Sequence, residues 1–176
     1  MALTLLIGGA RSGKSDAALA MASAWDGPVV FVATAQARDD EMAQRIARHR
    51  ASRPAEWTTV ETDDVTGALE AAAGDAFVVV DCLTLWLSRL MERELSDDDI
   101  NAVVAEAAAA AAARAGPTVA ITNEVGSGIV PDNPMARRFR DLLGGANRTW
   151  AAAASRSLLL VAGRALPLTS IEEATS

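Results

Sequence analysis

Short apolar runs alternate along this chain with segments in which apolar residues recur at every third or fourth position. The runs predict buried strands over residues 3–7, 28–33, 57–61, 76–80, 118–122 and 157–162. The helical spacing predicts helices over residues 14–25, 40–51, 65–73, 83–93, 97–115 and 134–154, the last either continuous or broken at Gly144-Gly145. Strands that alternate with helices in this way predict an α/β fold, with a mostly parallel sheet covered by helices on both faces.

The length of 176 residues fits a single domain. The sequence shows no linker, composition break or internal repeat, so we expect one domain over residues 1–168. Residues 169–176 form a polar C-terminal tail that we expect to be disordered.

The first predicted strand runs into a glycine-rich segment, Gly8-Gly9-Ala10-Arg11-Ser12-Gly13-Lys14-Ser15. This segment matches G-x-x-x-x-G-K-[ST] between a strand and a helix, the context of a phosphate-binding P-loop. Its glycines let backbone N–H groups turn toward phosphate, and the positive end of the next helix adds to the attraction. Lys14, the only lysine, is expected to bind the β- and γ-phosphates of ATP or GTP, and Ser15 to ligate Mg²⁺. The sequence thus predicts a nucleotide-binding enzyme with a P-loop NTPase-type (RecA-like) sheet.

The strand predicted over residues 76–80 ends in a carboxylate, Asp81. In P-loop proteins an acid at the end of such a strand holds Mg²⁺ directly or through water, and we expect this role for Asp81. The alternative is that Asp81 only caps the helix that begins near Leu83. The two roles are compatible.

Charge and cysteine content narrow the choice of partners and compartment. The formal charge of −7 argues against broad electrostatic binding of DNA or RNA, so we expect no nucleic-acid partner. The single cysteine, Cys82, cannot form an internal disulfide, which suits a reducing cytoplasm. The apolar start lacks a basic region and is too short for a signal peptide or a membrane span. We therefore expect a cytoplasmic protein without a membrane span.

The only histidine, His49, lies among arginines in the segment Arg45 to Arg53. On a helix it would share a face with Met42, Ile46 and Arg53. Guanidinium groups nearby attract polyphosphate and disfavour the imidazolium, which leaves a neutral imidazole able to act as a nucleophile. The alternative is an ordinary surface histidine on a basic helix face.

Six segments together resemble the bifunctional adenosylcobinamide kinase/adenosylcobinamide-phosphate guanylyltransferase family of cobalamin biosynthesis. The P-loop marks only a superfamily, whereas the segments that begin at Ala33, Arg45 and Thr122 are specific to the family. The resemblance spans nearly the whole chain. The segments are Gly8 to Ser15 (GGARSGKS), Ala33 to Met42 (ATAQARDDEM), Arg45 to Trp57 (RIARHRASRPAEW), Val80 to Ser88 (VDCLTLWLS), Thr122 to Asp141 (TNEVGSGIVPDNPMARRFRD) and Val161 to Leu168.

The resemblance implies two reactions at overlapping sites, and a homotrimer. In the first reaction, the γ-phosphate of ATP or GTP passes to the aminopropanol hydroxyl of adenosylcobinamide. In the second, the histidine that matches His49 attacks the α-phosphorus of GTP and expels pyrophosphate. The guanylyl-histidine then passes GMP to adenosylcobinamide phosphate, giving adenosylcobinamide-GDP. Such covalent catalysis divides one transfer into two in-line displacements.

The family's nucleotide-binding residues carry over to matching positions of this chain. With His49 and Lys14 as catalytic residues, and Ser15 and Asp81 as Mg²⁺ ligands, they make up the expected site. For Thr34 to Gln36 and Glu61, the alternative is ordinary polarity of a loop and a strand end. The carried-over positions are Gly8, Gly9, Ala10, Arg11, Ser12, Gly13, Lys14, Ser15, Thr34, Ala35, Gln36, Arg50, Ala51, Ser52, Arg53, Glu61 and Asp81.

Two later segments have open roles. The loop over residues 123–134 either contacts the corrinoid or nucleotide or only connects two elements. Beyond it, Arg137, Arg138 and Arg140 either contact phosphate or a neighbouring subunit, or form a solvated basic face.

Two rival functions stay open on the residues alone. One is a P-loop kinase of small molecules without guanylyl transfer, in which His49 has no role. The other is a nucleotide-binding regulator without catalysis. A switch GTPase is excluded, because such proteins recognise guanine through an Asn-Lys-x-Asp run and the only lysine here is Lys14.

Overall fold

The computed structural model describes residues 3–37, 40–51 and 53–175, without the side chains of residues 41, 42, 45, 48 and 49. The strands in this part are β1 (Leu3–Gly8), β2 (Val29–Ala33), β3 (Thr58–Glu61), β4 (Phe77–Asp81), β5 (Thr118–Asn123), β6 (Arg156–Val161) and β7 (Arg164–Leu168). The helices are α1 (Lys14–Ser23), α2 (Asp40–Ala51), α3 (Val65–Ala71), α4 (Leu83–Glu92), α5 (Asp97–Ala113), α6 (Pro134–Ala153) and α7 (Ile171–Thr175).

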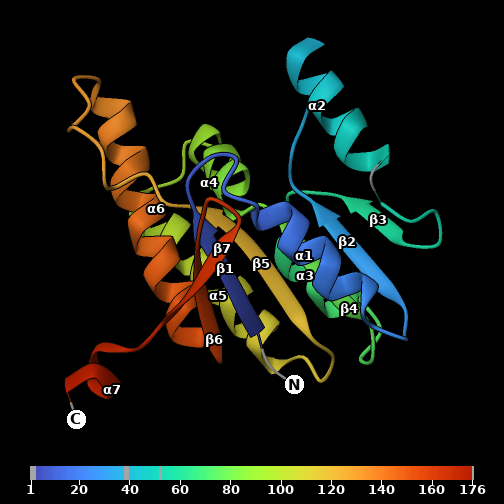
Figure 1. The fold of residues 1–176 in the computed structure, drawn as a ribbon. Coiled ribbons are helices and arrows are strands. Elements are labelled where there is room, and N and C mark those ends of the chain that lie inside the picture. The colour runs from blue at the N-terminus through green and yellow to red at the C-terminus, as the bar shows by residue number, and fades with distance from the viewer. Residues whose placement is uncertain (1–2, 38–39, 52, 176) are drawn as a thin grey trace.

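These strands form one sheet in the order β3-β2-β4-β5-β1-β6-β7 (Figure 1). Strands β1 to β6 are parallel, and only β7 is antiparallel to its neighbour. The carboxyl ends of the six parallel strands therefore lie at one edge of the sheet. In open α/β sheets this is the edge where ligands bind.

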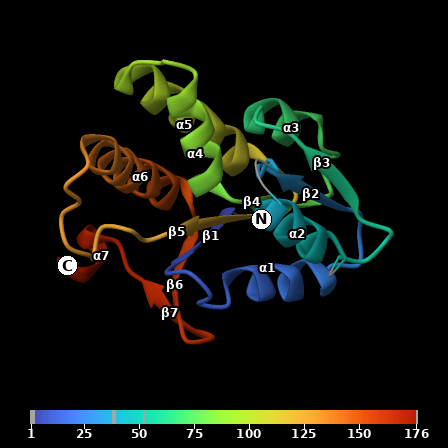
Figure 2. The ribbon, with the colours of Figure 1, turned by 90° about the horizontal axis from the view of Figure 1, so that it is seen from above.

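Successive side chains of a strand point to opposite faces of the sheet. In the central strands both sets of side chains are buried, so both faces of the sheet are covered. Val78 and Val80 pack with α3, α4, α5 and α6, whereas Phe77 and Val79 pack with α1. Figure 2 shows α1 on one side of the sheet and α3 to α6 on the other. The predicted α/β fold, with a mostly parallel sheet and helices on both faces in one domain, is confirmed.

The structure corrects the expected elements near the C-terminus. Helix α6 is continuous through Gly144-Gly145. A further strand, β7, pairs with β6, although Pro167 lies within it; proline is tolerated there because β7 is the edge strand. The tail expected to be disordered contains α7, whose first turn is capped by a hydrogen bond from the Glu173 N–H to the Ser170 hydroxyl.

No helix of the described part of the chain combines the length and the apolar character needed to cross a membrane.

Candidate functional site

The P-loop connects β1 to α1 and folds around the side chain of Lys14. The Lys14 ammonium donates to the carbonyl oxygens of Gly8 at 2.9 Å and Gly9 at 2.6 Å, and to the Ser12 hydroxyl at 3.3 Å. Lys14 is only 8% exposed. The loop thus holds its one ammonium at the centre of a ring of oxygen acceptors. Phosphate oxygens are stronger acceptors than these neutral carbonyl and hydroxyl oxygens, because they carry negative charge.

Two glycines of the P-loop are required by its geometry. At Gly8 a Cβ atom would lie 2.3 Å from the Leu160 carbonyl oxygen of β6, so no larger residue fits between β1 and β6. Gly13 has φ +96°, a left-handed conformation that favours glycine, and it directly precedes α1. Arg11 also adopts a positive φ, of 56°. Such backbone strain in a non-glycine residue often marks a functional loop.

The turn between β6 and β7 contacts the P-loop, which the sequence did not suggest. The Gly163 N–H donates to the Ser12 carbonyl at 3.0 Å. Ala162 and Gly163 have φ values of 51° and 72°, as in the tight turns favoured in β-hairpins. In the sequence, the signal for this turn was the pair Ala162-Gly163 between two apolar runs. Pro167 made the second of these runs a poor candidate for a strand. The last strands of the chain therefore help to hold the first loop.

Asp81 stands half-buried at the carboxyl end of β4. Helix α4 has Cys82 as its N-cap residue, so the alternative in which Asp81 caps this helix is wrong. Only β5 separates β4 from β1, which places Asp81 about 10 Å, or two strand spacings, from the strand that carries the P-loop. Asp81 and the P-loop thus share one edge of the sheet.

The three predicted site residues after β2, Thr34 to Gln36, differ in their exposure to solvent. Thr34 is completely buried, and its hydroxyl group bonds to the backbone of Cys82. A direct contact between Thr34 and a nucleotide is therefore blocked in this conformation. Ala35 is half-buried and Gln36 is exposed, so both remain predicted nucleotide contacts.

A second group of predicted residues gathers beyond β2 and β3. Arg50 lies 3.5 Å from the Glu61 carboxylate in an exposed ion pair, which contributes little to stability. The Arg53 guanidinium stacks on the Phe31 ring, 3.6 Å from its centroid. Burial lowers the pKa of Arg53, while the nearby carboxylates of Asp81 and Glu61 act in the opposite direction. Asp81 thus lies between the P-loop and this basic group.

The predicted nucleophile, His49, lies in α2, two residues before the helix ends at Ala51. Its side chain lies outside the described part of the structure, as does Ser52, so the predicted roles of both stay predictions. Arg53 follows the end of α2, so the expectation that it shares a helix face with His49 is wrong. Figure 1 shows α2 standing beyond the carboxyl ends of β2 and β3, on the side of the sheet edge where the P-loop lies.

Ser15 and Asp81 suit a magnesium ion. Mg²⁺ in proteins is commonly held by one or two side-chain oxygens together with substrate phosphates and water. Ser15 is half-buried in the first turn of α1, directly after Lys14. Among the described residues, no three His, Cys, Asp or Glu side chains gather into a metal site of their own. The available donors therefore fit a metal that binds together with phosphate.

The loop after β5 lies beside the P-loop, because the Glu124 N–H donates to the Gly8 carbonyl at 3.2 Å. Its apolar side chains Val125, Ile129 and Val130 are exposed. Three of the four arginines of α6 are engaged within the chain. Arg137 donates to the Pro131 and Asp132 carbonyls, Arg138 pairs with Asp97, and Arg140 pairs with Asp141. None of these contacts needs a ligand.

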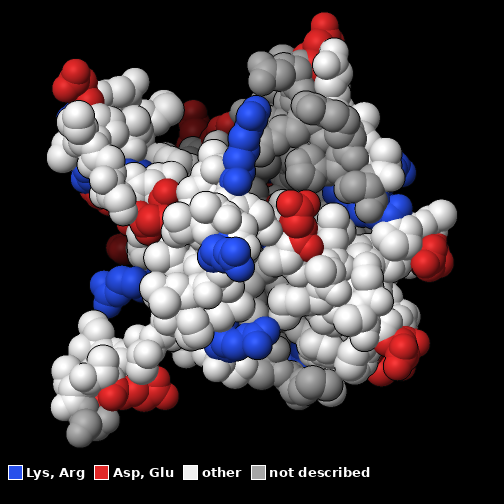
Figure 3. Space-filling view, in the orientation of Figure 1, with Lys and Arg blue, Asp and Glu red and all other residues white. Residues whose placement is uncertain are grey.

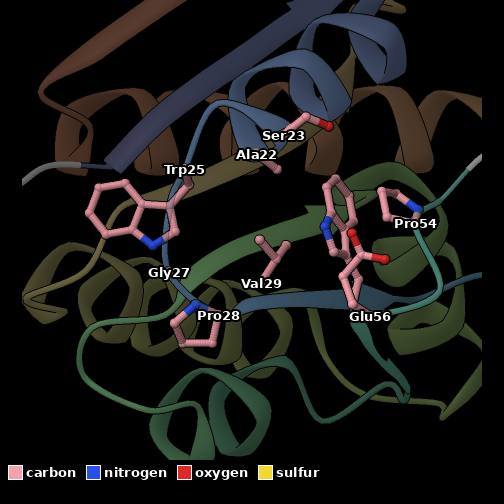
Figure 4. Close-up of a pocket in the computed structure, with 9 residues that line it drawn as sticks. Ala22, Ser23, Trp25, Gly27, Pro28, Val29, Pro54 and Glu56 are labelled. Carbon is pink, nitrogen blue, oxygen red and sulfur yellow. The ribbon is translucent and has the colours of Figure 1, made fainter.

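The described residues line two hollows that lie away from the P-loop. One, of about 310 Å³, opens between the end of α1 and the segment before β3, with Trp25, Pro28 and Pro54 on its walls (Figure 4). It lies at the amino ends of β2 and β3, opposite the edge that carries the P-loop. The other, of about 370 Å³, lies between α4 and the start of α6. Neither hollow is lined by a residue of the predicted site.

On the face drawn in Figure 3, acidic and basic side chains of the described residues are interspersed over a largely uncharged surface. Among the described residues, this face therefore shows no broad patch of a single charge.

Residues 4–168 match the family described as cobinamide kinase / cobinamide phosphate guanyltransferase. The chain is 39% identical over 181 residues to the bifunctional adenosylcobalamin biosynthesis protein CobU of Salmonella typhimurium, covering 92% of this chain and 96% of that protein. It is 41% identical over 170 residues to the bifunctional adenosylcobalamin biosynthesis protein CobP of Pseudomonas aeruginosa, covering 93% and 95%. With CobU of Escherichia coli the identity is 38% over 175 residues, covering 92% and 96%.

Among solved structures, an ATPase from the type III secretion system of pathogenic bacteria superposes with a TM-score of 0.61. The match covers 97% of this chain and 59% of that one at 11% identity, which shows a shared fold alone. The likeness confirms the P-loop NTPase type of the sheet. The sequence matches run through the P-loop, α2 and the end of β4, and they show that the chain belongs to the cobinamide kinase/cobinamide phosphate guanyltransferase family.

Proposed function

We propose that this chain phosphorylates adenosylcobinamide with ATP or GTP and then transfers GMP from GTP to the product, giving adenosylcobinamide-GDP and pyrophosphate. The observation that carries the proposal is the folded P-loop, closed around the Lys14 ammonium, in a chain of this family. The relatives are named as bifunctional proteins, and the second activity comes to this chain through that kinship.

In the phosphorylation step, the P-loop binds the nucleotide phosphates with its N–H groups and with Lys14. The substrate hydroxyl oxygen attacks the γ-phosphorus and its proton passes to water. The bond from the γ-phosphorus to the bridging oxygen breaks, and ADP or GDP leaves with that oxygen. Lys14 stabilises the charge that develops on the transferring group. Ser15 and Asp81 are the residues that would hold Mg²⁺, which when bound neutralises phosphate charge.

In the guanylyl-transfer step, a nitrogen of His49 attacks the α-phosphorus of GTP. A phosphorus–nitrogen bond forms, the bond to the β-phosphate bridging oxygen breaks, and pyrophosphate leaves. An oxygen of adenosylcobinamide phosphate then attacks the same phosphorus and displaces the imidazole, which is restored. The arginines that neighbour His49 in the sequence would attract the polyphosphate.

The site residues fall into two groups along the sheet edge, which supports two overlapping subsites. The P-loop follows β1, whereas Glu61 ends β3, four strand spacings or about 19 Å away. Asp81 lies between the two groups, and Arg53 of the second group is close enough to Asp81 for its carboxylate to affect the Arg53 pKa. We therefore assign the phosphates to the P-loop, and the base and the guanylyl group to the side of Arg50, Arg53 and Glu61.

We also propose that the protein is cytoplasmic, and that it forms a homotrimer as the resemblance implies. Cys82 is buried as a free thiol, which suits a reducing compartment. The C-terminal edge exposes Val161, Leu166 and Ile171, apolar side chains of the kind found between subunits. Sedimentation equilibrium should give three times the 18.3 kDa of the chain, and a monomer mass would contradict the trimer.

Incubation with GTP labelled at the α-phosphorus tests the proposal against its rivals. A guanylyltransferase should retain the label after denaturation, and the adduct should be stable in alkali and labile in acid, as a histidine phosphoramidate is. A kinase without guanylyl transfer would phosphorylate adenosylcobinamide but retain no label. A regulator without catalysis would do neither.

A further inference from the structure

The junction between β4 and α4 carries Asp81 and is held by a residue of another strand. The Thr34 N–H, directly after β2, donates to the Asp81 carbonyl at 3.0 Å. The Thr34 hydroxyl donates to the Cys82 carbonyl and accepts from the Cys82 N–H, both at 2.8 Å. Three hydrogen bonds thus join one buried residue to the two residues of this junction.

The same junction is held on its other side. The Asn123 N–H, at the end of β5, donates to the Thr84 hydroxyl of α4 at 2.9 Å. The Cys82 carbonyl also accepts from the Trp86 N–H at 3.1 Å, which closes the first turn of α4. The segment that carries Asp81 is therefore held by hydrogen bonds from the ends of both neighbouring strands, β2 and β5.

Thr34 is itself anchored from α4. Arg89 donates to the Thr34 carbonyl at 3.4 Å, and its guanidinium pairs with Asp63 at 2.8 Å. Arg93 also binds Asp63, and the Trp86 indole N–H donates to the Asp63 carbonyl at 2.8 Å. Because Thr34 is completely buried, the hydrogen bonds of its hydroxyl group are shielded from water.

We infer that Thr34 is a positioning residue for Asp81: its side chain fixes the peptide groups around the carboxylate, rather than binding the nucleotide. The inference rests on the proposed function, in which Asp81 acts next to the P-loop. The Thr34 hydroxyl donates to the Cys82 carbonyl and accepts from the Cys82 N–H. An apolar group of the same shape would therefore leave the buried Cys82 N–H without its acceptor.

The test compares Thr34→Val, which keeps the shape but lacks the hydroxyl, with Thr34→Ser, which keeps the hydroxyl. The first readout is the rate at which iodoacetamide alkylates Cys82, the only cysteine, in the folded protein without nucleotide or metal. We expect about a tenfold faster reaction in Thr34→Val and the wild-type rate, within about twofold, in Thr34→Ser. Equal rates in all three proteins would overturn the inference.

The second readout separates positioning from nucleotide binding. In Thr34→Val, the Mg²⁺ concentration for half-maximal phosphorylation should rise about tenfold, while the affinity for GTP measured in EDTA stays unchanged. The opposite pattern, with weaker GTP binding in EDTA and unchanged Mg²⁺ dependence, would make Thr34 a nucleotide contact instead. If Thr34→Val does not fold, Thr34→Ala replaces it, because it also lacks the hydroxyl. A wild-type protein without phosphorylation activity would refute the proposed function, yet the alkylation rates would still test Thr34.

Discussion

Replacing His49 with Asn is expected to abolish both the covalent GMP adduct and guanylyl transfer, while phosphorylation of adenosylcobinamide persists within about threefold. No other histidine can take over, because the chain has only one. Phosphorylation relies instead on the P-loop and Asp81, which belong to other elements than α2. The measurement is parallel assay of the two reactions and of retained α-label. Loss of a nucleophile stops one reaction, whereas loss of a binding residue weakens both reactions because the affinity for the nucleotide falls.

Asn is a suitable replacement because it keeps polarity and approximate size without a nucleophilic nitrogen. Arg148→Ala serves as the control, because Arg148 is an exposed residue of α6, a helix that lies apart from α2 (Figure 1). If the adduct persists in His49→Asn, the label is attached to another residue and the proposed guanylyl-histidine is wrong.

Replacing Lys14 with Ala is expected to lower phosphoryl transfer by about a thousandfold, the scale seen when a single donor to a developing charge is removed. The measurement is kcat/KM for phosphorylation. The ammonium also donates to the P-loop's own oxygens, so we expect a stability loss of about 1 kcal/mol in urea unfolding. Activity should be assayed well below the urea concentration at which the variant unfolds. Near wild-type phosphorylation by this variant would contradict the P-loop assignment.

The parallel strands and the covering helices were predictable from the sequence because both depend on local patterns. Apolar runs such as Phe77–Val80 are buried on both faces, which is typical of a parallel sheet covered on both sides. Strand β7 was missed because its burial is low and Pro167 interrupts its pattern. Helix α7 was missed because its five residues carry no apolar stripe, and only the Ser170 cap marks its start.

The candidate site was predictable where a motif fixes the backbone, as in the P-loop. The roles of Thr34, Arg89 and Gly163 were not, because each depends on contacts between segments far apart in the sequence. Thr34 bonds to Cys82, 48 residues away, and no local pattern records that pairing. The resemblance marked Thr34 as a site residue, but the structure shows a buried hydroxyl within a backbone joint.

The place of β1 in the sheet bears on how the protein is made. Among the described strands β1 is synthesised first, yet its two neighbours, β5 and β6, follow much later: Leu3 pairs with Thr118 and Thr4 with Arg156. At typical rates of synthesis, the 152 residues from Thr4 to Arg156 take roughly 8 to 30 s to appear. Until Thr118 has been synthesised, the apolar run Leu3–Ile7 has neither of its partner strands, and the P-loop lacks its contact with Gly163 until β6 and the turn after it have followed. We therefore expect a nucleotide to stabilise the nascent chain only after the segment through Gly163 has been synthesised.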